Sequence, residues 1–161
     1  MCGIIGYIGL YNCCNYILLN GLKQLQNRGY DSAGITSIDM SGNTTTTKYA
    51  SQENKDSLEL IGQNIHFHTT NIGIGHTRWA THGGKTDENS HPHNCMNNIF
   101  TVVHNGIIEN YSSLKKNLTC KGFIFKSQTD TEVISNLLLD NYNTNKNISV
   151  EEIINETCRM L

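Results

Sequence analysis

The sequence predicts a protein of the α+β class, because strand signals and helical repeats of apolar residues both occur along its 161 residues. A β-branched, glycine-bounded run opens the chain at 3–9, and such short runs are typical of strands. Apolar residues at helical spacing follow over 14–25. A chain of this length fits one domain and buries roughly 68–70 % of its unfolded surface, so its core needs neither disulfides nor metals.

The first half of the chain is predicted to contain strands, two helices and a hairpin. The opening run at 3–9 is expected to be a buried strand, and the helix after it is expected to stop by Gly29. A polar loop follows at 28–34, and the residues around Gly42 indicate a hairpin turn. The other expected elements are a strand at 35–39, a hairpin over 39–47, a helix over 53–62 and a strand at 72–76.

The second half is predicted to contain one strong strand signal and three helices. Residues 99–104 are expected to form the clearest buried strand, and the Asn-Gly pair at 105–106 is first of all a turn signal between strands. Capping-box patterns predict helix starts at Thr129 and Ser149, with Asp130 in the first turn of the earlier helix. A helix from near Ser112 and a short strand over 123–125 complete the prediction.

Composition excludes several classes of protein. The net charge of -2 provides no basic surface for nucleic acid, and no run reaches the ~18 apolar residues of a membrane helix. The N-terminal segment does not look like a secretion signal, and the six cysteines do not have the spacing of zinc ligands. We therefore expect reduced thiols and a cytoplasmic protein without a metal or other cofactor. His66 and His68 have no acidic or thiol companion nearby, which makes them a weak metal signal.

The cysteine at position 2 is the first candidate for chemistry. Removal of Met1 would leave Cys2 with both a thiol and a free α-amine. These groups titrate near ~8.5 and ~7.7–8.0 in model peptides, so they can exchange a proton around neutral pH. The nucleophile would then bring its own base. The alternative is an ordinary cysteine near a chain end, and its position alone does not separate the two.

Six short motifs occur in an order that resembles one family. They are C-G-I-I-G at 2–6, R-G-Y-D-S-A-G at 28–34, G-H-T-R-W-A-T-H-G at 75–83, H-P-H at 91–93, H-N-G-I-I-E-N-Y at 104–111 and T-D-T-E at 129–132. Together they closely resemble the glutaminase domain of glucosamine-fructose-6-phosphate aminotransferase, a class II glutamine amidotransferase, over nearly the whole chain. Amidophosphoribosyltransferases share the terminal cysteine and the Asn-Gly pair but differ at Tyr30, 79–82 and 107–111, so they are the second choice.

The resemblance also implies a fold and a domain organisation. The implied fold is that of the N-terminal-nucleophile hydrolases, a four-layer α/β/β/α sandwich of mostly antiparallel sheets. Residues 1–161 would be a glutamine amidotransferase type 2 (glutaminase) domain, truncated at its C-terminal end, because the last helix runs into Leu161 without a stop signal and the family's domain continues further. The sugar-phosphate isomerase half of the family is absent from this chain.

The resemblance assigns roles to nine residues. Cys2 is expected to attack the side-chain amide of L-glutamine, with its α-amine carrying the proton to ammonia. The Asn105 side chain and the Gly106 N–H are expected to stabilise the oxyanion. Arg78 is expected to bind the substrate α-carboxylate through two parallel hydrogen bonds, and Asp130 the α-ammonium. The other four are expected to line the pocket or to help hold the N-terminus: Trp79, Thr81, His82 and Arg28.

The expected reaction is hydrolysis of glutamine to glutamate and ammonia, as the ammonia-supplying part of glucosamine 6-phosphate synthesis from fructose 6-phosphate in hexosamine biosynthesis. The expected partners are L-glutamine and the sugar-phosphate isomerase domain of a homo-oligomeric full-length enzyme, with no nucleic acid and no membrane. Two alternatives stay open. One is a non-catalytic fragment that keeps the fold, and the other is a histidine metal site that uses His66, His68, His91 or His93.

Overall fold

The computed structural model of the chain describes residues 2–66, 70–80 and 83–161. The chain forms two compact units. The first unit comprises Met1–Pro92 and Val103–Asn105, and the second comprises His93–Val102 and Gly106–Leu161. Each unit has its own hydrophobic core and is described by itself.

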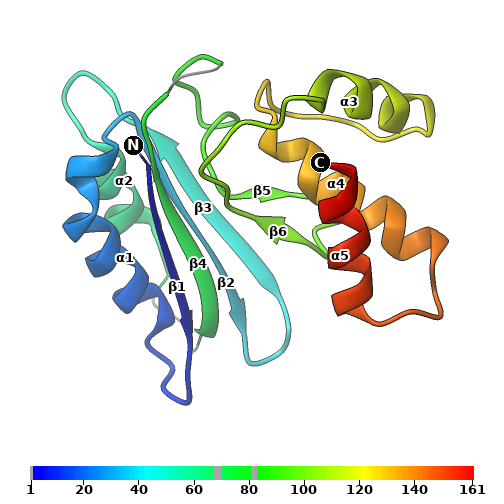
Figure 1. Cartoon of the computed structure of the whole chain (residues 1–161). Coiled ribbons are helices and arrows are strands. Elements are labelled where there is room, and N and C mark those ends of the chain that lie inside the picture. The colour runs from blue at the N-terminus through cyan, green and yellow to red at the C-terminus, as the bar shows by residue number, and fades with distance from the viewer. Residues whose placement is uncertain (1, 67–69, 81–82) are drawn as a thin grey trace. The chain divides into compact units, whose positions relative to one another are not determined.

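The first unit is built on a four-stranded antiparallel sheet with the strand order β1-β4-β2-β3 (Figure 1). Its elements are β1 (Gly3–Ile8), α1 (Cys14–Gln24), the 3-10 turn η1 (Gln26–Arg28), β2 (Ser32–Asp39), β3 (Thr44–Ala50), α2 (Ser57–Asn64) and β4 (Thr70–Arg78). The register pairs Gly3 with Thr77 and Ser32 with Arg78. The starts of β1 and β2 and the end of β4 therefore lie at one end of the sheet.

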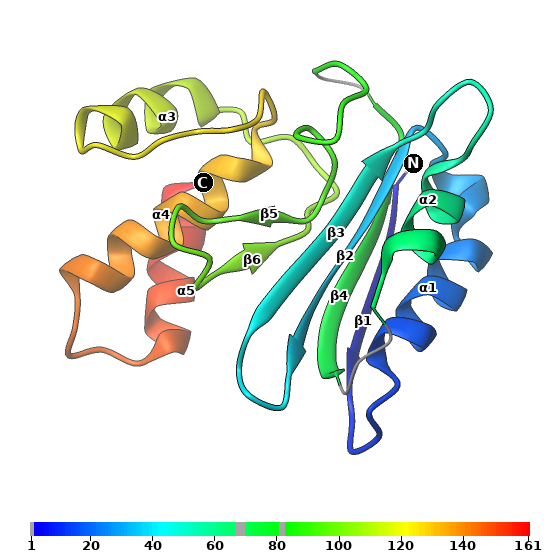
Figure 2. The same cartoon turned by 180° about the vertical axis from the view of Figure 1, so that it is seen from behind.

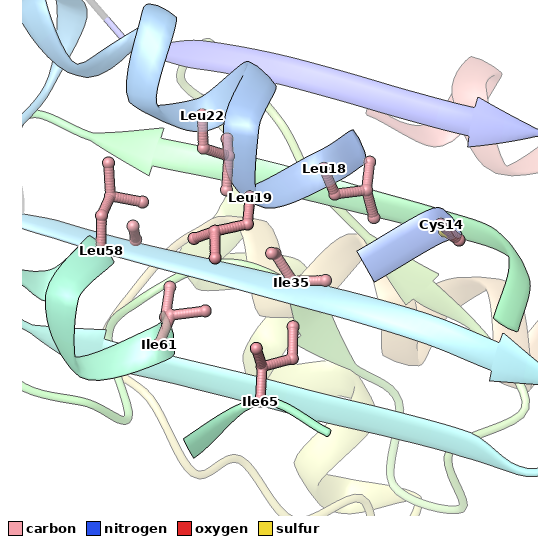
Figure 3. Packing of buried hydrophobic residues seen from close by; sticks show 9 residues of the cluster. Cys14, Leu18, Leu19, Leu22, Ile35, Leu58, Ile61 and Ile65 are labelled. Atoms are coloured by element: carbon pink, nitrogen blue, oxygen red, sulfur yellow. The ribbon is translucent and has the colours of Figure 1, made fainter. Parts of the chain in front are cut away.

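Both helices of the first unit cover the same face of this sheet, as Figures 1 and 2 show from opposite sides. Apolar residues of α1, α2 and β2 meet there and are buried, among them Leu22, Ile35 and Ile61 (Figure 3). Gly73 on β4 permits the close approach of α1, because a Cβ at this position would lie 2.7 Å from Cys14 Sγ. The amphipathic pattern of the first predicted helix is thus confirmed.

The opposite face of the sheet carries part of the segment that follows β4. Lys48 Nζ donates to three backbone carbonyls between 88 and 92, over distances of 2.6 to 3.2 Å. Ser90 and His91 are buried. The segment is therefore anchored to β3, and it brings His91 against the ring of His76 on β4.

Three predictions for the first unit need correction, each for a tertiary reason. β1 is an edge strand of the described sheet, so the expectation of a buried strand is wrong: Ile4 and Ile8 are 43 % and 80 % exposed. β2 begins at Ser32 rather than at 35, because it pairs along its length with both β3 and β4. α2 begins only at Ser57, because the Asp56 carboxylate accepts from two N–H groups of the first helical turn.

The second unit, which is described throughout, contains a two-stranded antiparallel sheet and three helices. Its elements are β5 (His93–Asn94), β6 (Thr101–Val102), α3 (Tyr111–Cys120), α4 (Thr131–Thr144) and α5 (Val150–Met160). α4 packs against both other helices and both short strands, and its residues Val133, Leu137 and Leu139 are buried in the core. Within the described ranges, no helix is long and apolar enough to cross a membrane.

Two strand predictions in the second half of the chain are wrong in extent. Only Thr101–Val102 of the predicted strand 99–104 forms a ladder, and 123–125 forms no strand. Phe100 and Phe123 instead pack in the helical core. Such a core accepts apolar side chains without requiring a strand partner, so an apolar run alone does not establish a strand here.

The two predicted capping boxes have different outcomes. Ser149 forms both bonds of the box at the start of α5, as predicted. The box predicted at Thr129 is wrong, because the Glu132 carboxylate accepts from the two N–H groups of 126–127 instead. Asp130 is accordingly the N-cap residue of α4 rather than a residue of its first turn, and its side chain makes no capping bond.

Candidate active site

The end of the sheet where β1 begins and β4 ends brings a thiol against the backbone. Because Gly3 pairs with Thr77, Cys2 lies beside Trp79, which is 77 residues away in sequence. The Trp79 N–H donates to Cys2 Sγ at 3.3 Å, and Sγ lies 3.8 Å from the Trp79 carbonyl oxygen. The half-buried thiol is therefore held at a strand end between two backbone groups.

Asn105 lies beside Cys2 although 103 residues separate them. Its Nδ2 donates to the Cys2 carbonyl oxygen at 3.0 Å, and its Oδ1 lies 2.8 Å from His76 Nε2. Asn105 itself is exposed. A carboxamide bonded at both ends is thus presented next to the thiol-bearing residue, and an amide N–H in such a place can stabilise an oxyanion.

His76 is bonded to Asn105 and is only 1 % exposed. Its ring stacks on that of His91, with the centroids 4.2 Å apart. Burial lowers the pKa of His76 from 6.5 to about 4; the hydrogen bonds to Asn105 and to the His104 backbone oppose this effect, and the charges of Arg78 and His104 add to it. The ring is therefore neutral at physiological pH.

The neutral state of His76 predicts a pH-dependent loss of stability. An unfolded chain protonates this histidine near pH 6.5 and the folded chain only near pH 4, so the unfolded state binds the extra proton between these values. The free energy of unfolding should fall by about 3 kcal/mol as the pH drops from 6.5 to 4, at about 1.4 kcal/mol per pKa unit. Chemical denaturation across this range measures the loss. A His76→Gln variant should lack it, and equal pH slopes in both proteins would contradict the prediction.

A buried carboxylate ties the segment after β4 to the start of β2. Asp31 Oδ2 accepts from the Ala80 N–H at 2.8 Å, and Oδ1 forms an ion pair with Lys85. Burial alone would raise the pKa of Asp31, but the bonds from Lys85 and Ala80, together with nearby positive charge, outweigh it and hold this pKa below its usual value. Asp31 is thus an anion at neutral pH, and it fixes the backbone next to Trp79.

Arg78 is the last residue of β4 and is buried. Its Nη1 donates to the Gly84 carbonyl oxygen at 3.4 Å. Gly29 permits another segment to approach closely, because a Cβ on Gly29 would lie 2.6 Å from the Arg78 carbonyl carbon. The register therefore places Arg78 at the same end of the sheet as Cys2.

Two of the other residues expected to line the pocket or hold the N-terminus, Trp79 and Arg28, lie within the described residues. Trp79 is 43 % exposed, and its ring meets the Tyr30 ring edge to face, with the centroids 5.2 Å apart. Arg28 ends the η1 turn and is exposed, and the described contacts do not join it to the thiol. Thr81 and His82 lie outside the described residues.

Gly106 and Asp130 belong to the second unit. Asp130 Oδ2 accepts from the N–H of Ile108 at 2.7 Å, so this carboxylate is fixed to the segment that begins at Gly106. The Asn-Gly pair does not form the predicted turn between strands, because β6 ends at Val102 and the next element is α3. Its backbone is thus in a loop that is bonded to Asp130.

Three residues of this region were not predicted from the sequence, namely Asp31, His76 and Lys85. Asp31 and His76 stand inside quoted motifs, but no sequence signal connects Asp31 with Ala80 and Lys85. A signal for His76 did exist: it lies two residues before Arg78 on a strand, and such residues share one face of a sheet.

The histidine alternative gains no support from the described part of the chain. There, no group of three or more His, Cys, Asp or Glu side chains could hold a metal ion. His91 stacks on His76, and His93 Nε2 shares a 2.9 Å hydrogen bond with the Thr129 hydroxyl. His68 lies outside the described residues.

Comparison with known families decides what kind of domain this is. The family model of the glutamine amidotransferase domain matches residues 61–144, which is more than half of the 161 residues. The chain belongs to the glutamine amidotransferase family. The matched range contains Arg78, Asn105, Gly106 and Asp130.

Curated relatives of this amidotransferase domain carry the name glutamine–fructose-6-phosphate aminotransferase (isomerizing). The protein of Methanococcus maripaludis is 48 % identical over 155 residues, which cover 96 % of this chain and 25 % of the relative. That of Staphylococcus aureus strain Mu50 is 45 % identical over 161 residues, 100 % of this chain and 26 % of the relative. That of Corynebacterium glutamicum is 46 % identical over 152 residues, which cover 91 % of this chain and 24 % of the relative. The expected resemblance is confirmed, and the chain spans about a quarter of the length of these relatives.

Two solved structures share the fold of the amidotransferase chain. One is the glutamine phosphoribosylpyrophosphate amidotransferase from B. subtilis complexed with ADP and GMP, with 28 % identity and a TM-score of 0.75 over 98 % of this chain and 32 % of that one. The other is the allosteric regulatory enzyme of purine biosynthesis, with 29 % identity and a TM-score of 0.76 over 98 % of this chain and 33 % of that chain. The α+β class and the N-terminal-nucleophile hydrolase fold are confirmed. The phosphoribosylpyrophosphate amidotransferase is less similar to this chain in sequence than the aminotransferases are.

Proposed function

We propose that this amidotransferase domain hydrolyses the side-chain amide of L-glutamine to glutamate and ammonia, with Cys2 as the nucleophile. The observation that carries the proposal is the pairing of Cys2 with Asn105, whose Nδ2 bonds the Cys2 carbonyl oxygen at 3.0 Å. A nucleophile and a donor for a developing oxyanion are thereby held side by side. Membership of the glutamine amidotransferase family supports glutamine as the substrate.

The proposed nucleophile depends on a processed N-terminus. Once Met1 is removed, the α-amine of Cys2 takes the thiol proton, and the thiolate attacks the amide carbon of glutamine. The C–N bond then breaks, the α-amine returns the proton to the departing ammonia, and a γ-glutamyl thioester remains. Water attacks this thioester and releases glutamate. The next residue supports a fixed N-terminus, because the Gly3 N–H donates to the Thr77 hydroxyl at 3.2 Å.

Asn105 and Gly106 are the proposed donors to the tetrahedral intermediate. Nδ2 of Asn105 carries two hydrogens, and the Cys2 carbonyl engages one of them. The second hydrogen is proposed to bind the oxyanion together with the backbone N–H of Gly106, the residue that follows Asn105 in the chain. Donors held in place before the reaction need no reorganisation when charge develops.

The ends of the free amino acid are proposed to bind Arg78 and Asp130. A guanidinium matches a carboxylate through two parallel bonds, which suits Arg78 at the sheet end that carries Cys2. The Asp130 carboxylate is bonded to the segment that begins at Gly106, which supports its proposed role toward the α-ammonium. The remaining proposed contacts are Trp79, Thr81, His82 and Arg28.

The names of the relatives extend the proposal to a larger protein. We propose that residues 1–161 are a glutamine amidotransferase type 2 domain and that its ammonia serves the synthesis of glucosamine 6-phosphate from fructose 6-phosphate. The proposed partner is a sugar-phosphate isomerase domain in a homo-oligomeric enzyme. A thiol nucleophile must stay reduced, which supports a cytoplasmic location.

The proposed activity is tested by measuring ammonia and glutamate after incubation of the purified chain with L-glutamine. Equal amounts of both products are expected. The intact mass of the same sample shows whether Met1 has been removed. No release of ammonia by a chain that has lost Met1 would contradict the proposal and favour the non-catalytic alternative.

Arg78→Lys is expected to raise the KM for glutamine about 10-fold or more, because a point charge cannot replace a two-pronged bond to the α-carboxylate. The kcat should change little, since the contact is made equally in the ground state and the transition state. Steady-state kinetics give both values. Arg159→Lys, at an exposed position in α5, is the matched control and should leave KM unchanged. An unchanged KM in Arg78→Lys would contradict the assigned role.

A further inference from the structure

We propose that His76 is a positioning residue: its ring fixes the orientation of the Asn105 carboxamide and so aims the Asn105 N–H donor at the oxyanion. The inference rests on the glutamine hydrolysis proposed above. It starts from the two contacts of Asn105, which join Nδ2 to the Cys2 carbonyl oxygen at 3.0 Å and Oδ1 to His76 Nε2 at 2.8 Å.

The first contact determines which way the carboxamide faces. A backbone carbonyl only accepts hydrogen bonds, so the Asn105 group 3.0 Å from the Cys2 oxygen is the NH2 group. The carboxamide oxygen then faces His76. A carboxamide rotated by half a turn would place two oxygens against each other at Cys2, and its NH2 group would face His76 instead of the Cys2 carbonyl oxygen.

The second contact determines the tautomer of His76. An amide oxygen only accepts, so Nε2 of His76 must carry a hydrogen. The ring is neutral, because burial lowers the pKa of His76 to about 4, and Nδ1 therefore carries no hydrogen. The neutral tautomer with Nε2–H is thus a requirement of the observed contacts.

The ring of His76 is held more firmly than the carboxamide that it contacts. His76 lies on β4, between β1 and β2, and pairs with Ile4 and Gly34. The residue is 1 % exposed, and its ring stacks on that of His91 at an interplanar angle of 16°. Asn105 is exposed and lies in no helix or strand. A site is well oriented when its groups are fixed by packed neighbours, so Asn105 depends on His76 for its orientation.

The test compares three variants of the 161-residue chain. His76→Leu removes the donor, whereas His76→Gln keeps an N–H donor near the position of Nε2. Thr36→Val is the matched control, because Thr36 is 3 % exposed and its hydroxyl bonds Thr46 at 2.8 Å in the same sheet, with no described contact to Asn105. Each variant is assayed for kcat and KM with glutamine and for the rate at which iodoacetamide alkylates Cys2.

A positioning role predicts a specific pattern of losses. The kcat of His76→Leu should fall ~10- to 100-fold, less than the ~10²- to 10³-fold loss on removing an oxyanion donor outright, with KM little changed. His76→Gln should recover part of the loss, and Thr36→Val should keep the native kcat. Alkylation should be unchanged in all three, because displacement of iodide by the thiolate forms no oxyanion. An unchanged kcat in His76→Leu, or a parallel loss of alkylation, would overturn the proposal.

A double variant tests whether His76 acts through Asn105. In the Asn105→Ala background, His76→Leu should cause no further loss of kcat. Independent roles would instead multiply the two losses, and this outcome would also overturn the proposal.

Nitrogen NMR of the imidazole rings tests the contact without any measurement of activity. His76 in the native chain should show the neutral tautomer with Nε2–H from neutral pH down to about pH 4. The other tautomer would overturn the proposal even if His76→Leu fails to fold. A native chain that shows the expected tautomer but releases no ammonia would refute the proposed function and leave the contact of His76 with Asn105 intact, so the two failures are distinguishable.

Discussion

Cys2→Ala is expected to abolish glutamine hydrolysis, with kcat falling by at least ~10⁴-fold, as happens when the nucleophile of a covalent mechanism is removed. Alanine leaves no group that can form the γ-glutamyl thioester, so Asn105 has no tetrahedral intermediate to stabilise. The measurement is ammonia released from saturating glutamine, together with a thermal unfolding curve to show that the fold is kept. The side chain of Cys2 is only half buried, so the substitution should cost little stability.

Cys120→Ala is the matched control for the Cys2 variant. Cys120 is an exposed free thiol at the end of α3, and its loss should leave ammonia release unchanged. Incubation with a glutamine-like electrophile should add one label at Cys2 and none in Cys2→Ala, as read by intact mass. Ammonia release at the native rate by Cys2→Ala would remove the basis of the proposed mechanism.

Asn105→Ala is expected to lower kcat ~10²- to 10³-fold while KM for glutamine changes little. The lost N–H donor acts on the oxyanion, which exists only in the transition state and the intermediate, so ground-state binding is preserved. Steady-state kinetics separate the two parameters. The variant also loses the bond from Nδ2 to the Cys2 carbonyl, so its unfolding curve must accompany the kinetics.

Two comparisons sharpen the Asn105 result. Asn105→Asp replaces the donor with a negative charge and should be at least as slow as Asn105→Ala. Asn43→Ala changes an exposed asparagine in the β2–β3 turn, at the end of the sheet away from Cys2, and should keep the native kcat. A rise in KM with an unchanged kcat in Asn105→Ala would assign the side chain to substrate binding instead.

Those parts of the fold were predictable in which a local sequence pattern is itself the physical cause of the helix, turn or cap. Apolar spacing in α1 produces the face that packs at Leu18 and Leu22, so the sequence pattern predicts this helix without knowledge of its packing partner. Gly42 adopts a φ of 83°, which explains why the hairpin turn was predicted correctly. The Ser149 cap involves residues only three positions apart and needs no tertiary context.

The candidate site was predictable only in part. Cys2, Arg78 and Asn105 stand in motifs that resemble a known family, and the first unit places all three at or beside one end of its sheet. Asp31 and His76 took on their roles only in the folded chain. The bonds from Asp31 to Ala80 and Lys85 join segments about 50 residues apart, and the local sequence pattern does not predict contacts over such a separation.

The sequence by itself determined where most helices and the turn at Gly42 form, because these depend on neighbours within a few positions. The residues proposed to carry the chemistry came from motifs that resemble a known family. Tertiary structure decided burial and strand extent. β1 has the pattern of a buried strand but lies at a sheet edge, and the run at 99–104 has the same pattern but pairs at only two residues. Burial of an apolar side chain and pairing of a strand both depend on which other segments of the chain pack against them.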